Sequence, residues 1–144
     1  MQATETASIQ KSVVVPLPIE KAFRLFTDGI SGWWPFESHS IEGDRVEAVV
    51  FDTDAARLYE RTPDGTEHDW ADIEAWEPPA RFLLNWRVNP TNAATEVEVR
   101  FTAEGEATRV ELEHRGWDRA GVGERSSYDG GWDYVLGTYV AATA

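Results

Sequence analysis

The residues of this chain that could carry acid–base chemistry are three histidines, His39, His68 and His114. Imidazole gains and loses a proton near neutral pH, so a histidine in a pocket can act as a general base or hold a polar ligand atom. The chain has no cysteine, which excludes a thiol nucleophile and a thiolate metal site. The histidines also lack the close spacing of metal ligands, so we expect no metal site and no cofactor.

His39 has two open readings. It follows Trp33, Trp34 and Phe36 in a segment before the second predicted strand, near aromatic side chains that could line the mouth of a cavity. There it could be a general base or a polar anchor for a ligand. Alternatively, it could only fix the loop through a nearby carboxylate or backbone group. His68 follows a predicted hairpin turn, and we expect it to be solvated.

His114 is predicted to point inward, because it alternates with Val110 and Leu112 along a strand. A histidine on the apolar face of a sheet needs a hydrogen-bond partner, since burying an unpaired polar group is costly. The partner could be a structural group such as the Tyr128 hydroxyl, or it could be a polar atom of a ligand.

Seven tryptophans are many for 144 residues. Trp86 is predicted on the inner face of a central strand and Trp132 on the helix opposite, where the two could pack together as core. One core seldom needs so many indoles, so we expect some of the tryptophans to line a cavity or its mouth. The others are Trp33, Trp34, Trp70, Trp76 and Trp117.

Residues 124–142 are predicted to form one long amphipathic helix. Its apolar positions are Tyr128, Trp132, Val135, Leu136, Tyr139 and Val140. Gly130 and Gly131 fall inside it at a cost of about 1 kcal/mol each relative to alanine. They allow either a close crossing against the sheet or space for a ligand.

Two further short helices are predicted at residues 19–28 and 30–34. Alternating apolar residues and turn signals predict strands at residues 9–15, 46–51, 57–61, 66–76, 81–88, 95–102 and 108–115. We therefore expect one α+β domain over residues 1–144, with a seven-stranded antiparallel sheet wrapped around the C-terminal helix.

Composition narrows the possible partners. The net charge of −13 argues against nucleic acid, because a phosphate backbone would be repelled. No apolar run approaches the length of a membrane span and no basic-then-apolar leader begins the chain, so we expect a cytoplasmic protein.

Several strings in order make the chain resemble the START-like helix-grip superfamily (SRPBCC). More narrowly, it is similar to the bacterial branch with homology to the heat shock protein 90 ATPase activator. The strings are VPLPIEKAF (15–23), WWP (33–35), SHSI (38–41), LYER (58–61), DGTE (64–67), WEPP (76–79), VELEHRGW (110–117) and GW (131–132). The chain departs from the family at Ala55, Ala56 and Ala71, where glycines are usual. Each alanine removes the freedom to adopt a positive φ.

The resemblance implies a cavity under the C-terminal helix that binds apolar or amphipathic small molecules, and in a minority of members catalyses reactions such as cyclisation or hydrolysis. Our leading hypothesis is binding of a small hydrophobic molecule that contains an aromatic ring. The expected ligand contacts are Trp34, Trp86, Phe101, Tyr128 and Trp132 as walls and His39 and His114 as polar groups.

Two other hypotheses remain open. One is a cyclase or hydrolase in which His39 or His114 is the general base. The other is a protein-interaction module, such as a chaperone cofactor, with a filled interior and an exposed apolar patch around Trp117.

Overall fold

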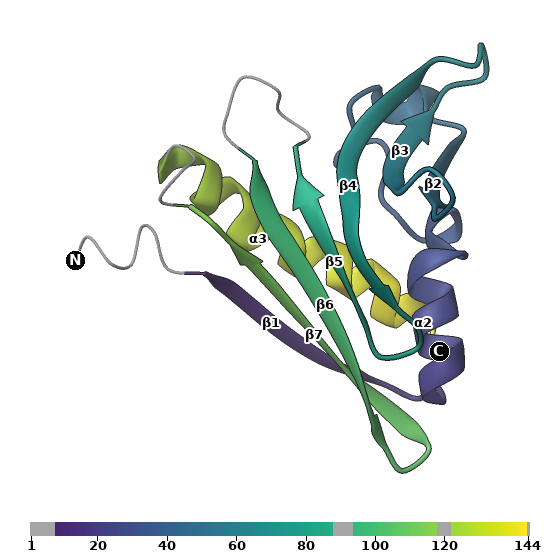
Figure 1. Ribbon diagram of the computed structural model, residues 1–144, viewed down its shortest axis with the longest axis vertical. Coiled ribbons are helices and arrows are strands. Elements are labelled where there is room, and N and C mark those ends of the chain that lie inside the picture. Colours follow the sequence, from purple (N-terminus) through teal and green to yellow (C-terminus); the bar gives the residue numbers. More distant parts are fainter. Residues whose placement is uncertain (1–7, 88–93, 118–121, 144) are drawn as a thin grey trace.

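The strands of the computed structural model join into one sheet, and two helices pack on it (Figure 1). The structure describes residues 8–87, 94–117 and 122–143, without the side chains of residues 122–127. The elements are β1 (Ile9–Val15), α2 (Ile19–Thr27), the 3₁₀ turns η1 (Ile30–Gly32) and η2 (Gly43–Arg45), β2 (Ala48–Asp52), β3 (Arg57–Arg61), β4 (Glu67–Glu77), β5 (Arg81–Trp86), β6 (Thr95–Glu104), β7 (Ala107–Arg115) and α3 (Val122–Ala142).

The sheet has seven strands in the order β1-β7-β6-β5-β4-β3-β2, and every neighbouring pair is antiparallel. Only β1 leaves sequence order: it crosses to the edge beside β7, where Ile9 pairs with His114. The other strands follow one another as a meander. The predicted α+β fold with a seven-stranded antiparallel sheet and a long C-terminal helix is confirmed.

The two faces of the sheet have different chemistry. On β6 and β7, buried residues alternate with partly exposed ones, so that Val97, Val99, Val110 and Leu112 face the core. The predicted strand alternation therefore identifies the inner face correctly. Charged side chains such as Arg115, which bonds to Glu96 and Glu98 on the neighbouring strand, occupy the alternate positions.

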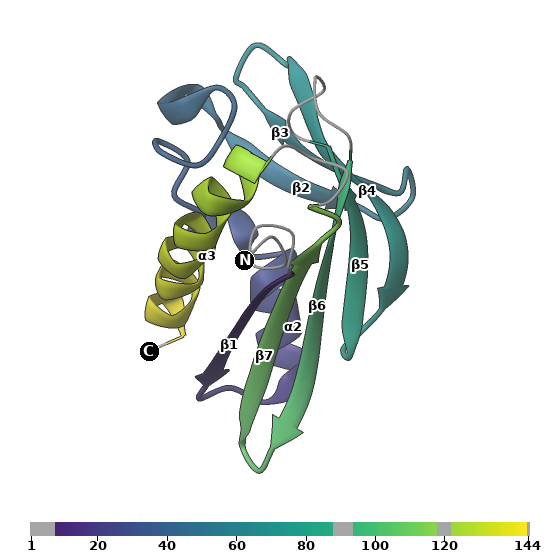
Figure 2. The ribbon, with the colours of Figure 1, turned by 90° about the vertical axis from the view of Figure 1, so that its left-hand side faces the viewer.

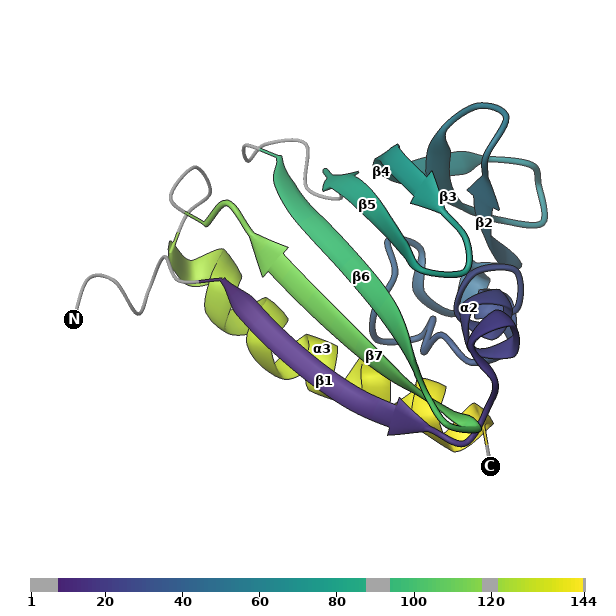
Figure 3. The ribbon, with the colours of Figure 1, turned by 60° about the horizontal axis from the view of Figure 1, so that its bottom comes forward.

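Helix α3 lies along one side of the sheet, as Figure 2 shows in side view, and runs beside β1 and β7 in Figure 3. Its apolar stripe is buried at Trp132, Val135, Leu136 and Tyr139. The Tyr139 hydroxyl donates a hydrogen bond of 2.9 Å to the Ala22 carbonyl and so ties α3 to α2. No helix in the described part of the chain is long and apolar enough to cross a membrane.

Candidate functional site

A pocket of about 330 Å³ lies between α3, strands β4 and β5, and the loop that follows η1. Most of the side chains around it are aromatic, and the polar ones come chiefly from the loop. The lining residues are Trp34, Ser38, His39, Ser40, Trp70, Trp86, Tyr128, Gly131, Trp132 and Val135.

Four indoles form a continuous wall of the pocket. Their ring centroids are 5.0 Å apart for Trp34 and Trp70, 6.0 Å for Trp70 and Trp86, 5.6 Å for Trp86 and Trp132, and 6.2 Å for Trp132 and Trp34. The four contacts close on themselves, so each ring is held by two others. We call these four residues the tryptophan wall.

Every indole N–H of the tryptophan wall is already hydrogen-bonded inside the protein. The acceptors are the His39 carbonyl for Trp34 (2.7 Å), Glu60 Oε1 for Trp70 (2.7 Å), the Tyr128 hydroxyl for Trp86 (3.0 Å) and His114 Nδ1 for Trp132 (2.9 Å). An indole has no other polar atom to offer. The tryptophan wall therefore presents only apolar and π surface to a ligand.

His114 is fully buried and does not line the pocket; it lies behind Trp132. Because an indole N–H can only donate, His114 Nδ1 must accept, and the proton of the neutral ring is on Nε2. Nε2 then donates to Thr95 Oγ1 at 2.7 Å. Burial lowers the His114 pKa from 6.5 to about 3, which keeps the ring neutral. The partners are thus Thr95 and Trp132 instead of the suggested Tyr128 hydroxyl.

His39 stands at the mouth of the pocket. Its Nδ1 lies 2.6 Å from Ser38 Oγ, and its ring stacks on Tyr134 with centroids 5.2 Å apart. Its Nε2 faces α3, because a Cβ built on Gly131 would lie 3.7 Å from it. The imidazole is therefore both fixed in the loop and on the pocket surface.

The loop is held by Glu60, a fully buried carboxylate on β3. Its two oxygens accept the backbone N–H groups of Ile41 (2.7 Å) and Glu42 (2.8 Å) as well as the Trp70 indole N–H. Sequence reasoning missed Glu60, although strand alternation from Leu58 places it on the inner side.

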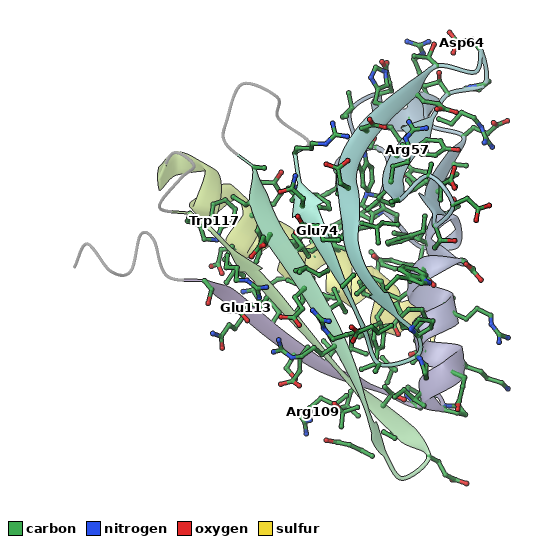
Figure 4. All side chains as sticks on the ribbon, viewed as in Figure 1. Arg57, Asp64, Glu74, Arg109, Glu113 and Trp117 are labelled. Carbon is green, nitrogen blue, oxygen red and sulfur yellow. The ribbon has the colours of Figure 1, made fainter. Side chains whose placement is uncertain are left out.

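Two expectations about exposure are wrong. His68 is not simply solvated: its Nε2 lies 2.8 Å from Glu42 Oε2, and its side chain is only 31% exposed. Trp117 does not form an exposed patch, because it is 1% exposed and packs on His114 with ring centroids 4.3 Å apart. Figure 4 shows Trp117 between the end of β7 and the first turns of α3.

Five of the seven expected ligand contacts come together around the pocket: Trp34, His39, Trp86, Tyr128 and Trp132. His114 and Phe101 do not. Phe101 is on the inner face of β6 but near α2, where its ring lies 5.1 Å from that of Phe23. Trp70 was among the tryptophans expected near a cavity, and Gly131 was one of two glycines that could leave space for a ligand, whereas Ser38, Ser40 and Val135 were missed as lining residues.

The glycine pair in α3 also divides in two. A Cβ at Gly130 would meet nothing within 4 Å, whereas one at Gly131 would touch His39. Neither glycine is needed for a close crossing against the sheet. Gly131 instead leaves room on the pocket side of the helix.

An antiparallel sheet that holds a long C-terminal helix, with an aromatic pocket between them, defines a helix-grip protein. Within that class, the chain belongs to the family of Activator of Hsp90 ATPase homolog 1-like proteins, whose model matches residues 16–143. No curated protein matches the chain.

Solved structures extend the comparison. The chain is similar to CalC, a self-sacrificing resistance protein from Micromonospora echinospora, with 28% identity and a TM-score of 0.75 over 96% of this chain and 95% of that one. It is 30% identical to Txn09, an anthrahydroquino-γ-pyrone synthase complexed with SUM, with a TM-score of 0.62 over 93% of this chain and 95% of that one. It shares its fold with the Aha1 dimer from Colwellia psychrerythraea, at 14% identity and a TM-score of 0.67 over 95% and 96% of the two chains.

Proposed function

We propose that the protein binds a small, apolar, ring-containing molecule in the pocket beside α3. The observation that carries this proposal is a space of about 330 Å³ walled by the tryptophan wall and Tyr128, with most of its polar groups on one loop. Its volume and its mostly apolar lining with a few polar groups suit a small-molecule site. A ring can stack on the indoles while a substituent reaches Ser38, His39 or Ser40.

Shape and similarity both favour rings over chains. Flat, rigid indole side chains around the pocket suit a fused or substituted ring better than an extended acyl chain. Txn09, at 30% identity, is a synthase of an anthrahydroquino-γ-pyrone, a compound whose name describes several fused rings. The likeness supports a ring-containing ligand for this chain.

One observation favours catalysis as a second candidate function. Ser38 Oγ and His39 Nδ1 are 2.6 Å apart at the mouth, so His39 could take up a proton through Nε2 on the pocket side. His114 is poorly suited to that role, because both of its nitrogens are bonded to Thr95 and Trp132. Hydrolysis of p-nitrophenyl acetate would test the idea. His39→Gln should remove any turnover that the wild type shows above the rate without protein, whereas His114→Gln should retain that turnover.

Binding can be tested with 1-naphthol as a neutral two-ring probe. Each tryptophan gives its own indole N–H signal in a ¹H–¹⁵N spectrum. We expect saturable shifts for Trp34, Trp70, Trp86 and Trp132, which line the pocket, and none for Trp76, which packs against Phe23 at 5.3 Å. Equal shifts of all these signals, or no shift at saturating probe, would contradict the proposal.

The glycine pair supplies matched variants. Gly131→Leu places a side chain on the pocket side beside His39 and should weaken 1-naphthol binding about tenfold or more, the effect of losing roughly 1.4 kcal/mol. Gly130→Leu adds the same side chain where nothing lies within 4 Å and should leave binding unchanged. Both changes remove a helix glycine, so their effects on helix propensity cancel in the comparison.

A further inference from the structure

We propose that the pocket prefers ring compounds that carry a positive charge, such as a quaternary or protonated aryl amine, over neutral or anionic compounds of the same shape. This inference rests on the proposed function and names the charge of the ligand for the same site. It follows from the aromatic surfaces of the wall, its hydrogen bonds and the charges behind it.

The wall consists of aromatic side chains, whose π faces attract cations. An aromatic ring has a negative face and a positive edge, and indole is the strongest cation-binding side chain of this kind. The tryptophan wall places four such groups around one space. The ring centroid of Tyr128 lies 6.3 Å from that of Trp86 and 6.4 Å from that of Trp132. Sites that recognise quaternary ammonium groups use several aromatic rings in the same way.

The positive ends of the indoles are not available to an anion. Each indole N–H of the tryptophan wall donates to an acceptor in the protein. An anionic ligand would therefore meet aromatic surface without the N–H donors that could offset its charge. Its remaining donors would be the hydroxyls and the imidazole at the mouth.

The groups behind the indoles increase this preference. The Glu60 carboxylate accepts the Trp70 N–H, and an anion at that position pushes electron density toward the ring. Its partners among the described residues are N–H groups and not a basic side chain. His114 accepts the Trp132 N–H as a neutral ring and adds no positive charge.

No lysine or arginine lines the pocket among the residues that the structure describes. Lys11, near the same end of α3, is bound to Asp129 and Asp133, each at 3.0 Å. The net charge of −13 adds a general attraction for cations. Because His39 lines the pocket, the comparison is made at pH 8, above the ordinary titration range of imidazole.

Three probes of closely similar shape separate charge from fit: phenyltrimethylammonium, tert-butylbenzene and benzenesulfonate. Titration at pH 8 into the wild type, followed by the same indole N–H signals, gives three dissociation constants. We expect the cation to bind about tenfold more tightly than tert-butylbenzene, within the range of a desolvated cation–π contact. Benzenesulfonate should bind more weakly than either. Salt at roughly 0.3 M shortens the reach of the acidic surface, so a surviving preference comes from the pocket.

The outcomes distinguish the two proposals. If tert-butylbenzene binds as tightly as the cation, or if benzenesulfonate binds most tightly, the charge preference is overturned while ring binding stands. If none of the probes shifts the lining indoles, ring binding fails and the preference with it. If the cation binds Gly131→Leu with the same dissociation constant as Gly130→Leu, it binds outside the pocket, and the inference is overturned.

Discussion

At the scale of single residues, His114 shows how surroundings decide what a histidine does. An inward imidazole next to an aromatic pocket is compatible with catalysis, but Thr95 and Trp132 occupy both of its nitrogens. The residue therefore fixes the indole of Trp132, which lines the pocket, and contributes to the site only through that ring. His39, which is less buried, keeps one nitrogen on the pocket side.

The buried imidazole makes stability depend on pH. In the unfolded chain His114 takes up a proton below pH 6.5, whereas in the folded protein burial lowers its pKa to about 3. The unfolded state then binds more protons between these values, so folding stability falls as pH falls from 6.5 to 3. Between pH 7 and pH 5 we expect a loss of about 2 kcal/mol from this residue.

Urea unfolding of the wild type and His114→Gln at several pH values measures this contribution. Glutamine can still donate to Thr95 and accept from Trp132, but it does not titrate. The difference in free energy of unfolding between the two proteins should change by about 2 kcal/mol between pH 7 and pH 5. A difference that stays constant over that interval would mean that His114 is not the group responsible.

At the scale of elements, periodicity predicted most of the fold. β1 and β3 have the bounds read from the sequence, and α3 begins two residues before the predicted start at residue 124. Alternation also identified which face of β5, β6 and β7 is inward. It could not say how far along the strand a pocket lies: Trp86 and Phe101 share the inner face, but only Trp86 reaches the pocket.

The loop wall of the pocket was beyond local patterns for a different reason. Its position depends on Glu60, which holds Ile41 and Glu42 from about twenty residues further along the chain. No helical or strand period marks such a contact. The turn η2, at Gly43–Arg45 in the same region, was not predicted either.

The turn between β2 and β3 carries a testable strain. Ala56, one of the alanines at which the family resemblance led us to expect glycine, has a φ of 56°. The left-handed conformation costs an alanine roughly 1–2 kcal/mol. We expect Ala56→Gly to raise the free energy of unfolding by about 1 kcal/mol, because glycine adopts this conformation freely but gains entropy when unfolded.

Ala55→Gly is the matched control, since Ala55 is in the same turn and has no positive φ. Its N–H bonds to Asp52 Oδ1 at 3.0 Å, a contact that glycine retains. This change should lower stability by up to about 1 kcal/mol through unfolded-state entropy. Thermal unfolding of both variants decides the matter: equal effects at the two positions would show that Ala56 carries no backbone strain.

At the scale of the whole molecule, acidic residues outnumber basic ones by 26 to 13. Several of the basic residues form ion pairs on the sheet, for example Arg57 with Asp69 and Arg115 with Glu98. Arg57, Arg109 and Glu113 are labelled along the sheet in Figure 4. Even with such pairs, the excess of carboxylates must repel one another over the surface.

Salt weakens both the attraction within ion pairs and the repulsion among the excess carboxylates. The larger of these two effects decides whether salt raises or lowers the free energy of unfolding. Exposed ion pairs each contribute about 0–1 kcal/mol and weaken as salt rises. Repulsion among the excess carboxylates acts across the whole surface and weakens too, which favours the compact state. Because the net charge is −13, we expect the repulsion to dominate, so that raising NaCl increases the free energy of unfolding by on the order of 1 kcal/mol.

Glu74 offers a direct test, because it is exposed and forms no ion pair with another described side chain (Figure 4). Glu74→Lys changes the net charge from −13 to −11 and Glu74→Gln changes it to −12, since each step removes one negative or adds one positive charge. At low salt both should be more stable than the wild type, with lysine giving the larger gain, and the gains should shrink as NaCl screens the surface. If salt instead destabilises the wild type and neither variant gains, the ion pairs on the sheet outweigh the repulsion, and the acidic surface is electrostatically balanced despite its excess charge.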